Sequence, residues 1–303
     1  MKYPVLTTIL LLFFQFSCYT SFAQSPYELK VDASQSITAI QPTMYGIFFE
    51  DINFAADGGL YAEMVKNRGF EFTMPMMGWE QLNSDRHSLN LNSGRATVIQ
   101  QTGNPANRNF LQVRVNNGER FALINEGFRG MGVKAGETYL LSLNAKPVKG
   151  QIETITFTLL DEQENILGQT RVQPNQDNWT TYEANFQATA TAERAKLKIT
   201  FTGQGEIALD MISLFPADTW QGRKKGLRKD LVQLLADMNP GFLRFPGGCI
   251  VEGRTLARRY QWKKTVGSIE DRTLLVNRWN TELAQRPTPD YYQSCGLGFF
   301  EYF

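Results

Sequence analysis

The feature that most limits the fold of this sequence is a long block, from about residue 75 to residue 215, in which apolar and polar residues alternate. Successive side chains of a strand point to opposite faces, so such alternation gives one dry face and one wet face. Short runs with this pattern recur, with turn residues between them, at 139–145, 155–159, 181–186, 197–202 and 207–215. Repeated short amphipathic strands of this kind predict an antiparallel β-sandwich.

The chain on either side of this block has a different pattern. One apolar run, residues 44–49, ends in two carboxylates, and a second, residues 242–245, leads into a Pro-Gly-Gly turn. Such runs are typical of parallel strands buried on both faces. Residues 60–67 and the apolar stripe from 227 to 238 have helical spacing. Strand, helix, insert, helix and strand together form a β/α crossover that the sandwich interrupts.

The fold class that follows is α/β plus all-β, in which a jelly-roll-like β-sandwich interrupts an incomplete (β/α)8 barrel. A closed barrel of this type needs eight strands and ~250 residues. The segments outside the insert supply only the first strands, so we expect the chain to be the amino-terminal part of a longer protein. The expected domains are a signal peptide (1–23), an extended segment that belongs to an accessory β-domain or stands alone (24–40), the first barrel strand, loop and helix (41–74), the sandwich insert (75–215) and the second barrel strand with its loops (216–303).

The first residues have the pattern of an export signal. Lys2 precedes an apolar run over 5–16, which is shorter than the ~20 residues that a membrane-spanning helix needs. Residues 21–23, Ser-Phe-Ala, offer a cleavage site before Gln24. We expect cleavage there and export to the periplasm or the extracellular space. An uncleaved anchor is one alternative, and lipid attachment at Cys18 is another, although the residues before Cys18 fit a lipoprotein site poorly.

The charge balance narrows the class of partner. Lys and Arg number 31 against 30 Asp and Glu, and the loss of Lys2 with the signal makes these counts equal. Proteins that bind nucleic acids or anionic membranes carry a clear positive excess. We therefore expect a neutral ligand, with no nucleic-acid partner and no transmembrane segment; the oligomeric state stays open.

Histidine and cysteine counts limit the chemistry further. His87 is the single histidine, which excludes a His-rich zinc centre and would force any Ser-His-Asp triad to use that residue. We expect no metal ion and no cofactor. Cys249 and Cys295 remain after signal cleavage, and their spacing does not decide whether they form a disulfide.

Several motifs resemble a known family. Residues 44–53, Met-Tyr-Gly-Ile-Phe-Phe-Glu-Asp-Ile-Asn, and their continuation over 58–65 resemble the first barrel strand and loop of the α-L-arabinofuranosidases of glycoside hydrolase family 51. Residues 242–253 resemble the second strand and loop of that family, and 260–267 resemble the continuation. The block ending at 207–216 is similar to the carbohydrate-binding modules inserted in some members.

The resemblance implies an enzyme that hydrolyses terminal α-L-arabinofuranosyl residues of arabinose-containing polysaccharides with retention. Retaining glycosidases use two carboxyl groups ~5–5.5 Å apart, one as acid/base and one as nucleophile. In the family both are glutamates from later barrel strands, the acid/base from a Gly-Asn-Glu-like stretch. Neither stretch occurs in this chain, so we expect no catalytic residue here and no activity from these residues alone.

Glu50, Arg244 and Cys249 are the candidate substrate-binding residues. Glu50 ends a predicted barrel strand, where α/β barrels hold substrate, and the family carries a substrate-contacting glutamate at this position; the alternative is a surface carboxylate that caps the next loop. Arg244 either orders the carboxylates of the site or joins two barrel strands. Cys249 follows a Gly-Gly turn that allows a ligand to approach the backbone, and pocket lining fits better than nucleophilic catalysis, because no activating base lies nearby in sequence.

Other residues have two readings of similar weight. Asp51, Asn53 and Glu252 are either supporting groups of the site or ordinary loop residues, and His87 is most simply a solvated loop histidine. A sugar could stack on Trp79, Trp179 or Phe128. Aromatic residues of a sandwich, however, lie more often in its core. A secreted carbohydrate-binding protein without catalysis is the alternative function, and a related barrel glycosidase that acts on another sugar is a further one.

Overall fold

The structure is a computed structural model in which residues 27–83, 93–116, 121–253, 255–278, 292–293 and 297–302 are described. The chain forms two compact units, Met1–Gln41 and Pro42–Phe303. In the first unit, residues 27–41 are exposed and contain no helix or strand. The predicted signal peptide (1–23) lies outside the described residues. Among the helices of the described part, none is long and apolar enough to cross a membrane.

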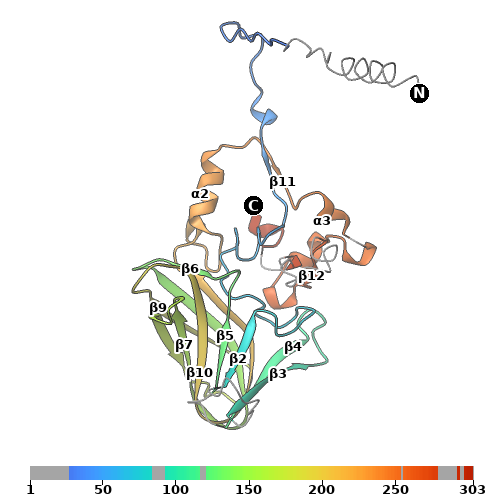
Figure 1. Ribbon diagram of the computed structural model, residues 1–303. Helices are drawn as coiled ribbons and strands as arrows, with labels where there is room; N and C mark the ends of the chain where they lie inside the picture. The colour runs from blue at the N-terminus through green and yellow to red at the C-terminus, as the bar shows by residue number, and fades with distance from the viewer. Residues whose placement is uncertain are drawn as a thin grey trace, which may run out of the picture. The chain divides into compact units, whose positions relative to one another are not determined.

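The second unit contains a nine-stranded sheet that folds into two layers (Figure 1). Its strands are β2 (Trp79–Asn83), β3 (Gly94–Gln100), β4 (Asn109–Val115), β5 (Phe121–Asn125), β6 (Met131–Val133), β7 (Thr138–Leu160), β8 (Ile166–Val172), β9 (Thr180–Gln187) and β10 (Ala192–Pro216). One end of the antiparallel β7–β10 ribbon pairs with β5 and β8, and the other end pairs with β4 and β9. The layers are therefore β2-β5-β10-β7-β8, called the first layer, and β3-β4-β10-β7-β9, called the second layer.

β7 and β10 are much longer than the sequence pattern predicted. The pattern predicted separate strands at 139–145 and 155–159, and again at 197–202 and 207–215, whereas the structure joins each pair into one strand. Gly150 and Gly203 have positive φ angles of 67° and 94°, and the β7–β10 register shifts between Thr202 and Gly203. Glycines that resemble turns in the sequence make bulges here, which bend the ribbon without ending it.

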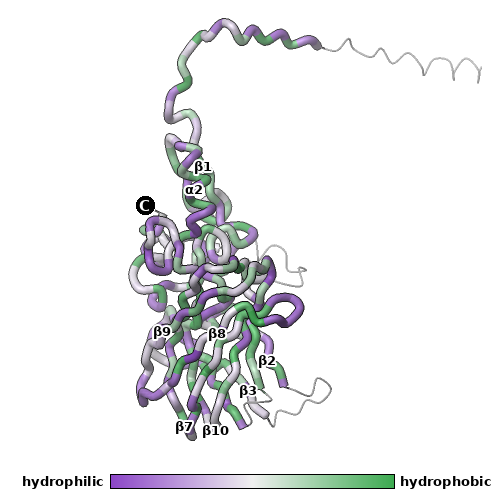
Figure 2. The backbone as a smooth tube through the Cα atoms, turned by 90° about the vertical axis from the view of Figure 1, so that its left-hand side faces the viewer, coloured by the Kyte–Doolittle hydropathy of each residue, from purple (hydrophilic) through white to green (hydrophobic). Residues whose placement is uncertain are grey.

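The hydrophobic core lies between the two layers. Leu141 and Leu143 of the second layer and Phe157 and Ile199 of the first layer are at most 1% exposed and belong to one core cluster. Figure 2 shows hydrophobic and hydrophilic stretches interleaved along these strands. The predicted β-sandwich is therefore confirmed, and the chain as a whole is predominantly β with few helices.

The rest of the second unit, residues 42–78 and 217–303, is called the host segments. A short parallel pair joins β1 (Ile47–Phe48) to β11 (Leu243–Arg244), although the whole sandwich separates them in sequence. The other helical and strand elements are η1 (Pro42–Met44), η3 (Trp220–Gly222), α2 (Lys229–Asp237), α3 (Cys249–Glu252), η4 (Leu256–Arg258), η5 (Trp262–Thr265), η6 (Ile269–Asp271), β12 (Leu275–Val276), β13 (Tyr292–Gln293) and η7 (Phe300–Tyr302). The parallel pairing of β1 with β11 and the helix α2 before β11 match two parts of the predicted crossover.

The helix predicted over residues 60–67 is wrong. The segment has no helical turn; Tyr61 forms an isolated bridge with Leu227, and the Met64 amide donates a hydrogen bond to the Leu214 carbonyl of β10 (2.9 Å). All residues from 61 to 67 are buried. A helix satisfies its own backbone and exposes one face, whereas this enclosed segment satisfies its backbone through tertiary partners.

The predicted burial of the host strands on both faces is also wrong for the described chain. Phe48 is 53% exposed and Leu243 is 40% exposed, because a two-stranded pair has no second layer over each face. α2 forms as predicted and ends before Pro240, yet Leu234 on its apolar stripe is 64% exposed. The host segments therefore present apolar side chains that nothing in the described residues covers.

Candidate functional site

Glu50 stands at the carboxyl end of β1, beside the turn that follows β11. The Phe49 amide donates to the Arg244 carbonyl (3.0 Å), which continues the parallel pairing up to Glu50. Glu50 Oε1 then accepts a hydrogen bond from the Gly248 amide (3.2 Å). A Cβ added at Gly247, whose φ is 134°, would lie 2.6 Å from Cγ of Glu50. Only glycine allows the turn to approach the carboxylate so closely.

Arg244 approaches the same turn from β11. A Cβ added at Gly248 would lie 3.7 Å from the Arg244 Nη2 atom and 3.9 Å from Glu50 Oε1, so both charged groups face the same point. The Arg244 guanidinium carbon also lies 4.7 Å from the ring centroid of Phe48, its partner across the β1–β11 pair. This cation–π contact fixes the arginine on the neighbouring strand while its charge faces Gly248.

Cys249 follows Gly248 and begins α3. It is a free thiol and is partly buried. The structure thus brings the three predicted substrate-binding residues, Glu50, Arg244 and Cys249, to one turn. Among the residues that the structure describes, no group of three or more His, Cys, Asp or Glu side chains could hold a metal ion.

The supporting residues have local structural roles. Asp51 is 6% exposed; its Oδ1 accepts a hydrogen bond from the Ala56 amide (3.2 Å), and its carbonyl accepts one from Asn277 Nδ2 (2.6 Å). These bonds shape the loop after Glu50. Asn53 lies in that loop with a φ of 56°, and Glu252 forms an exposed ion pair with Arg278 (2.8 Å). His87 lies outside the described residues.

Glu63, which no sequence pattern singled out, is a buried carboxylate that joins the host segments to the sandwich. Its Oε1 accepts from the Leu214 amide (3.0 Å), and its Oε2 bonds to the Ser213 hydroxyl and to Arg68 Nη1 (3.3 Å). Burial raises the pKa of Glu63, while Arg68 and these hydrogen bonds act in the opposite direction. The available signal was a charged residue inside a mostly apolar segment, but helical spacing would have placed it on a wet face.

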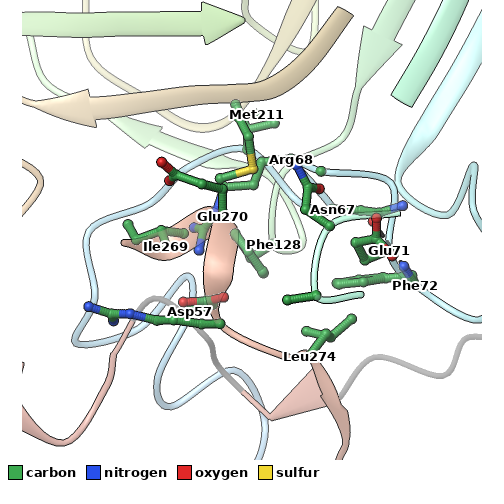
Figure 3. A pocket seen from close by; sticks show the side chains of 15 residues that line it. Asp57, Asn67, Arg68, Glu71, Phe72, Phe128, Met211, Ile269, Glu270 and Leu274 are labelled. Atoms are coloured by element: carbon green, nitrogen blue, oxygen red, sulfur yellow. Dashed lines mark hydrogen bonds between the residues drawn. The ribbon is translucent and has the colours of Figure 1, made fainter. Parts of the chain in front are cut away.

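A small cavity of about 60 Å³ lies where host segments meet β10 (Figure 3). Host residues Asp57, Arg68, Glu71 and Glu270 line it together with Asn107 and Met211 of the sandwich. Beside it, burial raises the pKa of Asp210 to about 7, whereas hydrogen bonds from Asn107 Nδ2 (2.8 Å) and from the Met211 amide (2.7 Å) lower it. The negative charges of Glu71 and Glu270 raise it further.

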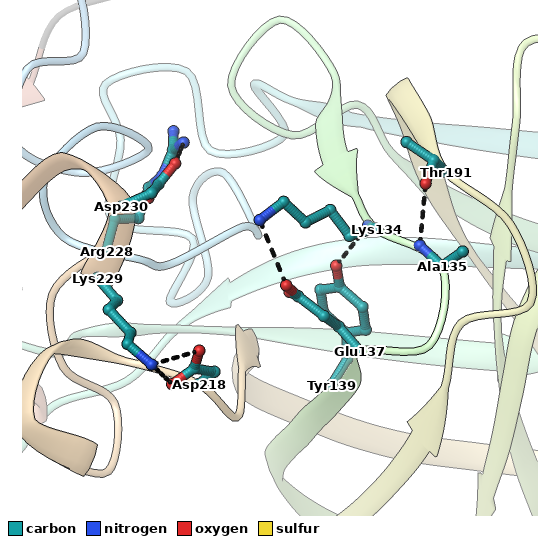
Figure 4. A network of polar contacts seen from close by, with 9 residues as sticks. All are labelled: Lys134, Ala135, Glu137, Tyr139, Thr191, Asp218, Arg228, Lys229 and Asp230. Carbon is teal, nitrogen blue, oxygen red and sulfur yellow. Dashed lines mark hydrogen bonds and ion pairs between the residues drawn. The ribbon is translucent and has the colours of Figure 1, made fainter.

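A larger groove of about 630 Å³ lies between β6, α2 and the segment around Tyr61. Its charged rim is paired within itself: Lys134 contacts Glu137 (3.4 Å), and Lys229 contacts Asp218 (2.9 Å) (Figure 4). The Lys134 amide also donates to the Tyr139 hydroxyl (2.9 Å). Since these charges neutralise each other, the rim gives the groove no strong preference for an ion.

The three predicted stacking aromatics have different environments. Trp79 is a core residue, 7% exposed, and its Nε1 donates to the Asn67 carbonyl (3.1 Å), so it offers no surface to a sugar. Phe128 is partly buried and packs edge-on against Phe54, with 5.4 Å between ring centroids. Trp179 is 38% exposed on the sandwich surface.

Two family models match separate parts of this chain. Residues 62–204 match a family model described as a carbohydrate binding domain, and residues 234–303 match one described as an alpha-L-arabinofuranosidase 1 domain. The chain is therefore similar to part of a glycosidase domain combined with a carbohydrate binding domain.

Individual relatives support a particular family. An extracellular exo-alpha-L-arabinofuranosidase of Streptomyces chartreusis is 38% identical over 91% of this chain and 32% of its own length, and alpha-L-arabinofuranosidase 1 of Arabidopsis thaliana is 33% identical over 91% and 40%. A solved structure of an arabinose-bound family 51 α-L-arabinofuranosidase matches with a TM-score of 0.73 and 33% identity, over 86% of this chain and 42% of that one. The chain is thus a relative of the α-L-arabinofuranosidases of glycoside hydrolase family 51, as its motifs predicted. It spans about a third to two fifths of their length.

Proposed function

We propose that the chain is part of a longer enzyme that releases terminal α-L-arabinofuranosyl residues from arabinose-containing polysaccharides with retention of configuration. The observation that carries the proposal is similarity to α-L-arabinofuranosidases over 91% of the chain. The charge-balanced sequence fits a neutral sugar substrate. The carbohydrate-binding domain that matches residues 62–204 fits a polymeric one.

In this proposal β1 and β11 are the first two strands of a (β/α)8 barrel. Their parallel pairing and the helix before β11 support this, as does the exposure of Phe48, Leu234 and Leu243, which further strands and helices would cover. The acid/base and nucleophile glutamates then belong to parts of the longer protein outside this chain. Our proposal therefore assigns substrate binding, and no catalytic residue, to these 303 residues.

Glu50 holds the substrate in this scheme. A carboxylate fixed at a strand end accepts hydrogen bonds from furanose hydroxyls, and this orients the ring for attack at the anomeric carbon. The Gly248 amide donates to the carboxylate and fixes its position, and the Arg244 guanidinium faces the same turn. Cys249, the residue after Gly248, is placed beside the bound sugar in this scheme.

Substitution of Glu50 tests the proposal in the longer protein. Glu50→Gln should lower kcat/KM for an aryl α-L-arabinofuranoside by more than about tenfold, because a charge-assisted hydrogen bond contributes about 1.5–3 kcal/mol. The melting temperature should stay close to that of the wild type. Glu80→Gln, at an exposed position of β2, is the matched control and should keep full activity. A large fall in melting temperature with unchanged kinetics would assign Glu50 to structure instead.

The stereochemical outcome is a second test. Proton NMR of the first-formed sugar should show the retained anomer, and initial appearance of the inverted anomer would refute the mechanism. A longer protein that binds arabinose-containing polysaccharides without any turnover would favour the alternative, a carbohydrate-binding protein without catalysis, for which the match of residues 62–204 is the supporting observation.

Export is part of the proposal. The relative from Streptomyces chartreusis is described as extracellular, and the first residues have a signal-like pattern. A mature protein that begins at Gln24 in the secreted fraction would support cleavage, and a lipid-modified Cys18 in a membrane fraction would support the anchored alternative.

A further inference from the structure

A loop of the sandwich contacts the chain that follows Glu50. The two segments are residues 126–130, which join β5 to β6 and are called the sandwich loop, and residues 51–60, called the host loop. The ring of Phe128 in the sandwich loop packs edge-on against the ring of Phe54 in the host loop, with 5.4 Å between the centroids and 69° between the planes. The sandwich therefore touches a segment that begins directly after a candidate substrate-binding residue.

The host loop has an unusual backbone close to Glu50. Asn53 and Phe54 have φ angles of 56° and 62°, which residues other than glycine adopt infrequently. Such conformations persist where the surrounding structure holds them in place. Hydrogen bonds join these residues to Glu50, because the Ile52 amide donates to the Glu50 carbonyl (2.9 Å) and the Ala55 amide donates to the Ile52 carbonyl (3.1 Å). The loop thus needs support from outside, and a shift of Phe54 would be transmitted to Glu50.

Side chains from outside the host loop surround Phe54. Besides the Phe128 ring, the Arg129 guanidinium carbon lies 5.3 Å from the centroid of the Phe54 ring, and Lys66 Nζ lies 5.5 Å from it. Cation–π contacts of this kind attract positive groups to an aromatic ring. Gly58 allows Phe128 to approach, because a Cβ added at this position, whose φ is 76°, would lie 2.2 Å from Cγ of Phe128. Both loops are therefore shaped for this contact.

The sandwich loop is itself fixed by hydrogen bonds. The Gly127 amide donates to Asn125 Oδ1 (3.0 Å), and the Gly130 amide donates to the Glu126 carbonyl (3.0 Å). Asn125, the last residue of β5, is 0% exposed and makes two hydrogen bonds with the Lys66 backbone (3.1 and 2.9 Å). Glu126 also forms an ion pair with the Lys66 ammonium group (2.9 Å). A loop bonded in this way holds its central side chains in one position.

We infer that the sandwich supports the substrate site, with Phe128 as a positioning residue that acts through Phe54 on the host loop and so on Glu50. The rigid sandwich loop holds Phe54, and Phe54 holds the unfavourable backbone that follows the carboxylate. Substrate orientation needs such support, because a displacement of about 1 Å can lower the rate of an enzyme by about a hundredfold. The inference rests on the proposed function of Glu50, but the support of the host loop is measured without catalysis.

Hydrogen exchange in variants of the longer protein tests the support. Phe128→Ala removes the ring that packs on Phe54, and Phe128→Tyr keeps it. Phe110→Ala is the matched control, because Phe110 is also partly buried and packs edge-on (5.6 Å, 78°), but its partner, Trp179, belongs to the sandwich. Mass spectrometry should show that the amides of residues 52–61 exchange at least about tenfold faster in Phe128→Ala than in the wild type, since the loop opens more often. Phe128→Tyr and Phe110→Ala should exchange like the wild type in this segment.

Kinetics on a soluble aryl α-L-arabinofuranoside test the positioning role. At a temperature at which all the variants are folded, Phe128→Ala should lower kcat/KM at least about fivefold, because Glu50 is displaced. Phe128→Tyr and Phe110→Ala should keep the wild-type value. A small glycoside needs no polymer binding by the sandwich, so a loss in Phe128→Ala is a loss at the site itself.

Unchanged exchange of residues 52–61 in Phe128→Ala would overturn the inference, and so would equal effects of Phe128→Ala and Phe110→Ala. Faster exchange without a kinetic loss would refute the positioning role, because the contact would then stabilise the fold and leave Glu50 in place. A wild-type longer protein that does not hydrolyse the glycoside would refute the proposed function instead. The exchange experiment would still decide in that case whether the sandwich supports the host loop.

Discussion

The sandwich and the host segments bury their apolar side chains to different extents. The sandwich buries Leu141, Phe157 and their neighbours between its own two layers, and Met64, Val65 and Phe70 of the host segments join the same core cluster. A smaller cluster joins Tyr61 of the host segments to Phe215 of β10, and the host segments leave Phe48 and Leu234 exposed. The sandwich is thus stabilised mainly by packing between its own layers, whereas the host segments depend on tertiary contacts with other parts of the protein.

The boundary between the two regions is polar as well as apolar. Glu63 and Asp210 are both buried there, and burial raises the pKa of each carboxyl group. A buried carboxyl group that keeps its hydrogen bonds tolerates the low dielectric, but its ionisation is costly. The comparison therefore separates three environments, which are a dry core, a buried polar boundary and an exposed apolar surface, and each can be tested by one substitution.

The largest effect is expected in the sandwich core. Phe157→Ala should lower the free energy of unfolding by about 3–5 kcal/mol, because a large ring at 0% exposure leaves a cavity between the layers. Phe48→Ala is the matched control, and it should lower the free energy of unfolding much less, because Phe48 is half exposed. Chemical denaturation of both variants measures the difference. Equal costs would mean that the host strand is packed as tightly as the sandwich.

The next effect is a pH dependence at the boundary. Because the pKa of Asp210 rises from 3.8 to about 7 on folding, the folded state holds a proton that the unfolded state releases. The contribution of protonated Asp210 to the free energy of unfolding is complete below about pH 4, and it is lost as the pH rises through 7. At about 1.4 kcal/mol per pKa unit, the change from 3.8 to about 7 corresponds to a loss on the order of 4 kcal/mol.

Asp210→Asn removes this titration and should make the stability of the protein less dependent on pH. Thermal melts of the wild type and the variant at pH 4.5, 6 and 7.5 should show the wild type losing stability relative to the variant as the pH rises. Asp237→Asn, at an exposed position of α2, is the control and should follow the wild type. Parallel profiles for Asp210→Asn and wild type would show that Asp210 titrates normally, and the boundary would then be better hydrated than its burial suggests.

The smallest effect is expected on the exposed apolar surface. Leu234→Ala should change the free energy of unfolding of this chain by less than about 0.5 kcal/mol, because the side chain is 64% exposed and alanine is at least as good a helix former. In the longer protein the same change should cost more, if further barrel elements cover α2. Identical effects in both would contradict the proposal that this surface is covered.

The sequence predicted those parts of the fold whose pattern arises from local packing. Alternation identified the strands that contain Leu141, Phe157 and Ile199, because each faces a continuous dry layer. It could not identify the bends at Gly150 and Gly203, since a glycine that ends a strand and one that bends it look alike in sequence. The helix expected over residues 60–67 failed for the opposite reason, because long-range hydrogen bonds determine the conformation of that segment.

Prediction of the candidate site had a similar limit. The position of a carboxylate directly after an apolar run, together with the family resemblance, made Glu50 a candidate, because strand ends gather functional groups. The closeness of Gly248 to that carboxylate depends on the β1–β11 pairing across the sandwich, which no local pattern contains. Glu63 was missed because its partners, Ser213 and Leu214, lie far away in the chain.

The bonds of Glu63 also have a consequence for how the two regions would work together. A module on a flexible linker searches a volume, and the gain in local substrate concentration depends on linker length. Here Glu63 and the Met64 amide of the host segments form hydrogen bonds to β10, so no flexible linker separates the two regions at this point. A polysaccharide bound to the sandwich would therefore have a fixed orientation relative to the host segments.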